Sequence, residues 1–236
     1  GYVATGSRLS DSWVNAANRG ASIASMSFGC AGMALCFSAN EVRAMAGSTL
    51  AGTLFVKAAG NDGRSLANES ISVTPAQGQT ALSRLILVGS VNNARTISTF
   101  SNRPGEGCLL TSGQTACTST TQWKYRFIVA PGEYIYATLP GNAYGYMSGT
   151  SMATPIVAAT AALLESRWPS LKAQPSVVAD ILFNSATDLG APGVDAIYGR
   201  GLLNVTRAFQ NYGTTQVVSP TGASLTVSGG SVTTSG

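Results

Sequence analysis

Residues 54–63, LFVKAAGNDG, combine a buried strand with a tight turn. The first six of these residues form a run that is apolar apart from Lys57, without the polar alternation of a half-exposed strand. Strands that are buried on both faces have this pattern. The run ends in a turn between Gly60 and Gly63, which would expose the side-chain amide of Asn61. Such a strand is typical of a parallel sheet that helices cover on both sides.

Similar segments recur along the chain, and helical segments separate them. Apolar runs predict three more buried strands, at residues 23–26, 84–91 and 127–130. Helical periodicity predicts helices at residues 10–19, 38–51, 152–167 and 175–187. The second of these helices opens with Ser38 and Glu41, which have the spacing of a capping box. This alternation predicts an α/β fold with a doubly wound, mostly parallel sheet and helices on both of its faces.

The composition narrows the functions that the chain can have. With 236 residues, it is long enough for one large domain or two small ones. Only 10% of the residues are charged, so the net charge of +4 does not arise from a basic run, and nucleic acid is not an expected partner. No apolar run approaches the ~20 residues of a membrane helix. The sequence has no histidine, which removes the commonest general base near neutral pH and the commonest metal ligand.

The four cysteines fall into two local pairs, Cys30 with Cys36 and Cys108 with Cys117. Both spacings suit disulfides that close short surface loops, although four cysteines allow three connectivities. Neither pair has the two-residue spacing that is usual for zinc ligands. Disulfides imply an oxidising, extracytoplasmic compartment, whereas four reduced thiols would fit a cytoplasmic protein.

Three short segments carry polar residues that suit chemistry. In SGTSMATP, residues 148–155, Ser151 lies at the start of an Ala-rich helix, where unpaired N–H groups and the helix dipole favour a developing oxyanion. In AAGNDG, residues 58–63, the amide of Asn61 is a neutral donor of the kind that an oxyanion hole needs. SMSFG, residues 25–29, is a strand end that suits pairing with an extended peptide.

These segments, in this order, resemble those of the subtilisin-like serine proteases, the subtilases. The resemblance extends to LILVGSVNNARTISTFSNRPG, to VAPG followed by IYATLPGN, and to YGRGLLNVTRAF, and it spans most of residues 1–212. It implies a three-layer subtilisin-like fold. Residues 1–212 would be the C-terminal part of the peptidase domain, with the first strands of that domain missing from this chain.

Residue by residue, the resemblance implies a serine endopeptidase that works through an acyl-enzyme. Ser151 would be the nucleophile, and its backbone N–H would form the oxyanion hole with the Asn61 amide. The specificity pocket would lie between two segments, Ser27, Phe28, Gly29 and Ala58, Ala59, Gly60. Val73 would lie near the pocket floor, and residues 2–4 would be the strand that pairs with substrate. These residues are mostly apolar or small, which favours a large hydrophobic P1 residue in a peptide or protein substrate.

The catalytic Asp and His of subtilases lie upstream of the substrate-pairing strand, and this chain has neither motif. We expect them in an N-terminal segment of the same protein, so that these 236 residues alone would be inactive. Two alternatives remain open. Lys57 could serve as the base for Ser151 in a Ser–Lys arrangement. The chain could also be a non-catalytic relative that keeps the peptide groove as a binding or structural module.

Beyond residue 213 the sequence carries no charge and has short valine-containing runs between Gly-Ser turns. We predict that residues 213–236 are a linker or the start of a β-rich module. This favours a larger secreted or bacterial cell-surface protein of the autotransporter type, which reaches a membrane only through a downstream anchor. Residues 103–124 are expected to form a surface excursion between two strands. Subtilases often bind calcium, but its ligand loops cannot be identified in this sequence, and we predict no metal and no cofactor.

Overall fold

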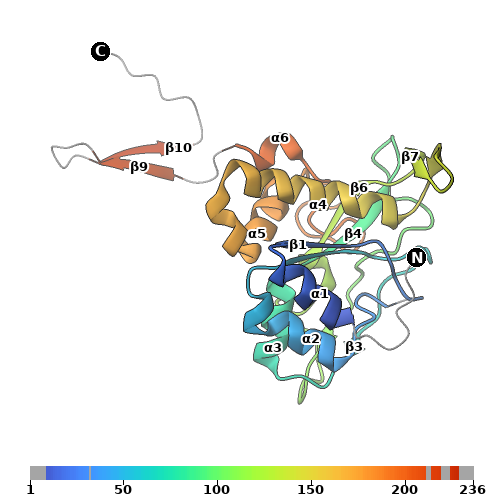
Figure 1. Cartoon of the computed structure of the whole chain (residues 1–236), viewed down its shortest axis with the longest axis horizontal. Helices are drawn as coiled ribbons and strands as arrows, with labels where there is room; N and C mark the ends of the chain where they lie inside the picture. Colours follow the sequence, from blue (N-terminus) through green and yellow to red (C-terminus); the bar gives the residue numbers. More distant parts are fainter. Residues whose placement is uncertain (1–8, 32, 211–213, 219–223, 229–236) are drawn as a thin grey trace, which may run out of the picture.

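The computed structural model describes residues 9–31, 33–210, 214–218 and 224–228. Four parallel strands form its central sheet (Figure 1). The strands lie in the order β1 (Ile23–Met26), β2 (Leu54–Ala58), β4 (Leu85–Val91) and β6 (Phe127–Pro131). Each strand pairs in parallel with the next. All four predicted strands are confirmed, with ends that differ by at most one residue.

Helices cover both faces of the sheet (Figure 1). One layer consists of α1 (Leu9–Asn18), α2 (Ala39–Ala46) and α3 (Pro75–Ser83), and the other of α4 (Thr150–Arg167) and α5 (Pro175–Ser185). Short helical turns are η1 (Ser48–Leu50), η2 (Trp123–Arg126), η3 (Pro169–Ala173) and α6 (Val205–Ala208). The predicted α/β fold, a parallel sheet between two helical layers, is confirmed.

The strands are buried because successive residues point to opposite helical layers. Phe55 and Leu87 pack in the core beneath α1, α2 and α3, whereas Val56 and Val88 pack against α4 and α5. All four side chains are completely buried. In β2 and β4, every residue is buried, so these strands carry no regular polar alternation, which made them recognisable in the sequence, whereas the edge strand β1 exposes Ser25.

The helix predicted over residues 38–51 is shorter in the structure. Its capping box is confirmed, because the Ser38 N–H donates to the Glu41 carboxylate at 2.7 Å. The helix ends at Ala46 because Gly47 adopts an extended conformation, and the separate turn η1 follows.

Helix α3 lies in a region where no helix was expected from the sequence. Its start nevertheless carries two helix signals. Pro75 occupies the first turn, and Thr74 and Gln77 form a capping box in which each side chain accepts a hydrogen bond from the backbone N–H of the other.

Residues 103–124 lie between β4 and β6, and residues 112–120 are exposed or partly exposed as predicted, but the two ends of the segment are not on the surface. Leu109 and Trp123 are completely buried. The short strand β5 (Leu109–Leu110) pairs in parallel with β3 (Glu69–Ser70). The Trp123 indole N–H donates to the Ala67 carbonyl at 2.8 Å, which satisfies the one polar group of this side chain. The two ends of the segment therefore belong to the core, and only its middle is a surface loop.

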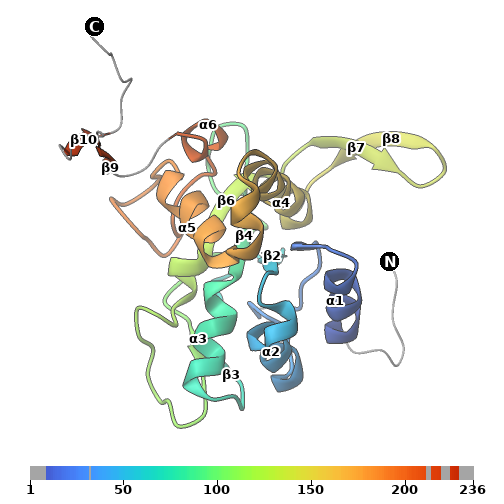
Figure 2. The ribbon, with the colours of Figure 1, turned by 60° about the vertical axis from the view of Figure 1, so that its left-hand side comes forward.

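Two β-hairpins complete the described chain. Strands β7 (Ile135–Leu139) and β8 (Ala143–Met147) pair in antiparallel fashion, lead from β6 into α4 and project from the body of the molecule (Figure 2). Strands β9 (Thr214–Val218) and β10 (Ser224–Ser228) form the second antiparallel pair. The domain boundary near residue 213 stays a prediction.

Both predicted cysteine pairs form disulfides. The Cα–Cα separations are 5.8 Å for Cys30–Cys36 and 5.7 Å for Cys108–Cys117. In the part of the chain that the structure describes, no helix is long and apolar enough to cross a membrane. These same residues include no group of three or more His, Cys, Asp or Glu side chains that could hold a metal ion.

Gly89 in β4 offers a test of how tightly the sheet packs. A Cβ at this position would lie 2.6 Å from Cζ of Phe127. We predict that Gly89→Ala lowers the free energy of unfolding by about 1–3 kcal/mol, the usual cost of overpacking, in urea denaturation of the full-length protein. The double variant with Phe127→Leu should lose less than the sum of the two single losses, and additive losses would contradict the steric cause.

Candidate functional site

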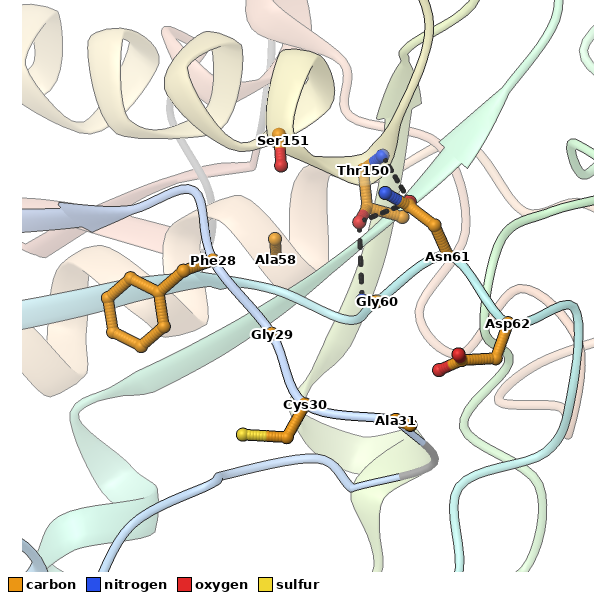
Figure 3. Close-up of a pocket in the computed structure, with 10 residues that line it drawn as sticks. All are labelled: Phe28, Gly29, Cys30, Ala31, Ala58, Gly60, Asn61, Asp62, Thr150 and Ser151. Carbon is orange, nitrogen blue, oxygen red and sulfur yellow. Dashed lines mark hydrogen bonds between the residues drawn. The ribbon is translucent and has the colours of Figure 1, made fainter. Parts of the chain in front are cut away.

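Three chain segments meet at the carboxyl edge of the parallel sheet (Figure 3). One follows β1, the second follows β2, and the third is the first turn of α4. Together they enclose a pocket of about 150 Å³. The pocket is lined by Phe28, Gly29, Cys30, Ala31, Ala58, Gly60, Asn61, Asp62, Thr150 and Ser151. The candidate nucleophile and the candidate oxyanion donor thus border the same cavity.

Ser151 is the second residue of α4 and is half-buried. Its hydroxyl donates to the Ser27 carbonyl at 3.1 Å, and the Ser27 hydroxyl donates to the Ser151 carbonyl at 2.9 Å. This reciprocal pair ties the end of β1 to the first turn of α4. The backbone N–H of Ser151 lies in that first turn, where N–H groups have no intrahelical acceptor and the helix dipole favours negative charge.

The side chain of Asn61 is oriented by Thr150. Its Oδ1 accepts two hydrogen bonds, from the Thr150 N–H and from the Thr150 hydroxyl, both at 2.9 Å. Thr150 is completely buried, and its Oγ1 also accepts from the Gly60 N–H at 3.2 Å. Because the Asn61 oxygen is engaged on one side, its NH₂ group is the end that can donate to another molecule. Asn61 can therefore act as a hydrogen-bond donor beside Ser151.

A buried asparagine holds the turn that carries Asn61. The amide of Asn102 donates to the Ala59 carbonyl at 3.0 Å and to the Asp62 carboxylate at 3.1 Å. Its Oδ1 accepts from the Asp62 N–H at 3.0 Å. Gly60 reaches this turn with a φ of 101°, and a Cβ on it would lie 2.5 Å from the Asn102 amide nitrogen. The turn therefore requires both the glycine and the asparagine.

Most of the predicted pocket residues meet in the structure. Phe28, Gly29, Ala58 and Gly60 line the cavity together with Asn61 and Ser151. Ser27 contacts Ser151 directly, whereas Ala59 is completely buried and its N–H donates to the Val88 carbonyl at 3.0 Å. Val73 is buried in the core on the α1–α3 side and is not one of the residues that line the pocket. Residues 2–4 lie outside the described residues.

Asp62 also lines the pocket, although the sequence reasoning did not single it out. It directly follows Asn61 in the same turn. The sequence did contain a signal for Asp62, because it is a charged residue beside Asn61 in a turn flanked by glycines. Its carboxylate brings a negative charge into a pocket whose other lining residues are uncharged.

Lys57 lies on the other face of β2 from the α4 layer. Its Nζ donates to the Phe28 carbonyl at 3.2 Å and to the Ala58 carbonyl at 3.1 Å, and the side chain is completely buried. Burial lowers the pKa of Lys57 to about 8, and the Glu69 carboxylate opposes this shift. The hydroxyl of Ser151 instead donates to the Ser27 carbonyl. The geometry therefore gives no support to a Ser–Lys pair.

Comparison with known proteins identifies the family of the chain. Residues 3–201 match the family described as the subtilase family. Subtilisin DY from Bacillus licheniformis is 35% identical over 159 residues, which cover 67% of this chain and 47% of that protein. Subtilisin from Bacillus pumilus is 36% identical over 160 residues, again 67% of this chain and 47% of that protein. The chain thus spans about half the length of the curated relatives that it matches.

Solved structures share the fold. The structure of the patellamide maturation protease PatA superimposes with a TM-score of 0.63 and 29% identity, covering 85% of this chain and 66% of that chain. The prenylagaramide maturation protease PagA gives a TM-score of 0.62 and 27% identity, covering 85% of this chain and 65% of that chain. Since the family match also extends over most of the sequence, the chain belongs to the subtilase family.

Proposed function

We propose that this protein is a serine endopeptidase in which Ser151 forms the acyl-enzyme. The observation that carries the proposal is the placement of the Ser151 hydroxyl and an oriented Asn61 amide around one pocket. Attack of Oγ on the substrate carbonyl would create an oxyanion. The Ser151 N–H and the Asn61 NH₂ group would stabilise it as the two donors of the oxyanion hole. The subtilisin relatives and the maturation proteases PatA and PagA support a proteolytic function.

We propose that the base for this reaction lies outside these residues. A histidine would take the Ser151 proton, an aspartate would orient that histidine, and the proton would then pass to the leaving amine. The sequence contains no histidine, so we propose that both groups belong to an upstream segment of the same protein. In this view residues 1–212 are the C-terminal part of the peptidase domain.

The edge of β1 is a place where such a segment can add strands. Among the described residues, β1 pairs with β2 alone. Ser22 precedes β1, and its hydroxyl donates to Oε2 of Glu165 at 2.5 Å. The other oxygen, Oε1 of Glu165, is buried and has no hydrogen-bond partner among the described residues. A covering segment with a donor near Ser22 would give this oxygen a hydrogen-bond partner and would also pair with the backbone groups on the open edge of β1.

The pocket suggests the class of substrate. Ala58 is a small apolar residue of the lining, Phe28 borders the pocket with an exposed ring, and the glycines at positions 29 and 60 leave room for a substrate backbone. We propose an apolar P1 side chain in a peptide or protein substrate. The carboxylate of Asp62, which accepts from Asn102, is the one charged group among the described residues that line the pocket, and it disfavours acidic P1 residues.

The setting of the protein is also part of this proposal. Two disulfides support an oxidising, extracytoplasmic location, either secreted or at a bacterial cell surface. The antiparallel pairing of β9 with β10 supports a β-rich module after residue 213. An autotransporter-type protein with a downstream membrane anchor would combine these features.

Covalent labelling tests the nucleophile. We expect a fluorophosphonate to label the full-length protein at Ser151 and to leave Ser151→Ala unlabelled, as read by mass spectrometry of the labelled peptide. Ser166→Ala, an exposed serine on the same helix, is the matched control and should be labelled normally. Labelling that persists in Ser151→Ala would contradict the assignment. An intact wild-type protein that is not labelled would favour the non-catalytic peptide-binding module.

Replacement of Asn61 tests the oxyanion hole. Asn61→Leu keeps the approximate size of the side chain and removes its donor. We expect kcat of the full-length protein to fall about 10²–10³-fold with little change in KM, the size of effect known for removing this kind of donor from subtilisin itself. Asn93→Leu, an exposed change in the loop after β4, is the control. A loss confined to KM would argue against an oxyanion role.

The missing base predicts the behaviour of the 236-residue chain on its own. This polypeptide should not turn over a fluorogenic peptide, because none of its residues is a histidine that could accept the Ser151 proton. Addition of the upstream segment should restore turnover. Turnover by the isolated chain that Ser151→Ala abolishes would contradict the proposal and would require another base within these residues.

A further inference from the structure

Lys57 is an unusual residue for the middle of a buried parallel strand. Its side chain is completely buried, yet the peptidase mechanism proposed above makes no use of its amine. Among the described residues, Nζ donates to the carbonyls of Phe28 and Ala58, which both line the pocket, and it lies 5.5 Å from the centroid of the Phe28 ring. Burial of this cation costs free energy, and the charge of Glu69 offsets part of that cost, because it opposes the fall in the pKa of Lys57.

The position of this amine in the sheet is specific. The parallel ladder between β1 and β2 ends with the pair Met26 and Lys57. Phe28 lies just beyond that end, where the chain forms one wall of the pocket, and Ala58 lies on the opposing wall. The Lys57 amine therefore connects the two walls by hydrogen bonds to the carbonyls of Phe28 and Ala58. It does so just beyond the last residue pair of the ladder between β1 and β2.

A second buried charge holds the far end of the same wall. Glu69 in β3 is 6% exposed, and its carboxylate accepts from the N–H groups of Ala34 and Leu35, the latter at 3.0 Å. Burial raises the pKa of Glu69, whereas these backbone bonds and the charge of Lys57 lower it. Residues 28–36 are thus attached to a buried cation at one end and a buried carboxylate at the other. The Cys30–Cys36 disulfide closes the loop between them.

We propose that Lys57 is a positioning residue, which holds the Phe28 wall against the Ala58 wall and so fixes the width of the pocket, while Glu69 anchors the far end of the Phe28 wall. The inference rests on the proposed peptidase function, because it takes the pocket as the site of the P1 side chain. Lys57 does not line the pocket, but it would control the shape of the pocket from outside the lining.

The variant Lys57→Met tests this role. Methionine has a similar length and no donor, and replacing a buried charge with an apolar group is often neutral or stabilising, so the protein is expected to fold. In the full-length protein, we expect amide hydrogen exchange in residues 27–37 to become at least about tenfold faster, since the carbonyl of Phe28 loses its tie. KM should rise severalfold for peptides with Phe or Leu at P1 and little for Gly at P1, with kcat nearly unchanged.

Arg84→Met is the matched control. Arg84 also donates to backbone carbonyls, those of Met45, Gly47 and Leu50, but these lie at the end of α2 and in η1 rather than at the pocket. This variant should leave exchange in residues 27–37 and the P1 preference as in the wild type. If Lys57→Met does not fold, Glu69→Leu removes the acceptor of the second anchor and should speed exchange at residues 33–37.

The outcomes separate the two proposals. The positioning role would be overturned if residues 27–37 of Lys57→Met exchanged their amide hydrogens at the wild-type rate. It would also be overturned if KM rose by the same factor for every P1 residue. If the wild-type protein has no peptidase activity at all, the proposed function fails, and the exchange measurement alone decides the role of Lys57. Equal effects of Arg84→Met and Lys57→Met on exchange would also overturn it, because a general loss of rigidity would then explain both.

Discussion

The candidate site depends on one constraint, that parallel strands bring all their carboxyl ends to the same edge of a sheet. The segments after β1 and β2 must emerge side by side, and α4 returns to that edge with its amino end. Thr150, in the first turn of α4, then contacts two residues of the turn after β2. Its hydroxyl donates to the side chain of Asn61 and accepts from the N–H of Gly60. Without the two helical layers that bury the sheet, none of these three segments would be fixed relative to the others.

The strands could be predicted to within one residue because burial on both faces of β2 and β4 leaves runs that are almost entirely apolar, and the edge strand β1 is a short run of the same kind. The elements that were missed or misjudged depend on single residues. Gly47 ends α2 by adopting an extended conformation, which apolar periodicity does not reveal. Trp123 lies in a stretch rich in Ser, Thr and Gly, and it enters the core because the Ala67 carbonyl is there to accept its indole N–H. That acceptor is distant in the sequence, so local composition predicted a surface loop.

The same contrast holds for the candidate site. Ser151 and Asn61 stand in short motifs whose spacing and flanking glycines predict their exposure at the ends of elements, and the structure places both at one pocket. The partners that orient them could not be predicted in this way. Asn102 holds the Asn61 turn from a distance of about forty residues in sequence, and Glu69 bonds to the amide of Leu35 across a similar separation. Such contacts follow from the order of strands in the sheet rather than from neighbouring residues.

The geometry of Gly60 limits how the pocket could change during evolution. Its φ of 101° and the 2.5 Å approach of the Asn102 amide to a Cβ at this position exclude any larger residue while the turn keeps its shape. Gly29 on the facing wall is different, since a Cβ there would lie at an ordinary contact distance of 3.4 Å from the Cα of Gly60. Two glycines that lie side by side in the lining of one pocket therefore differ in the variation they tolerate. Divergence in substrate preference among descendants of this sequence would be recorded at position 29, while position 60 would remain glycine.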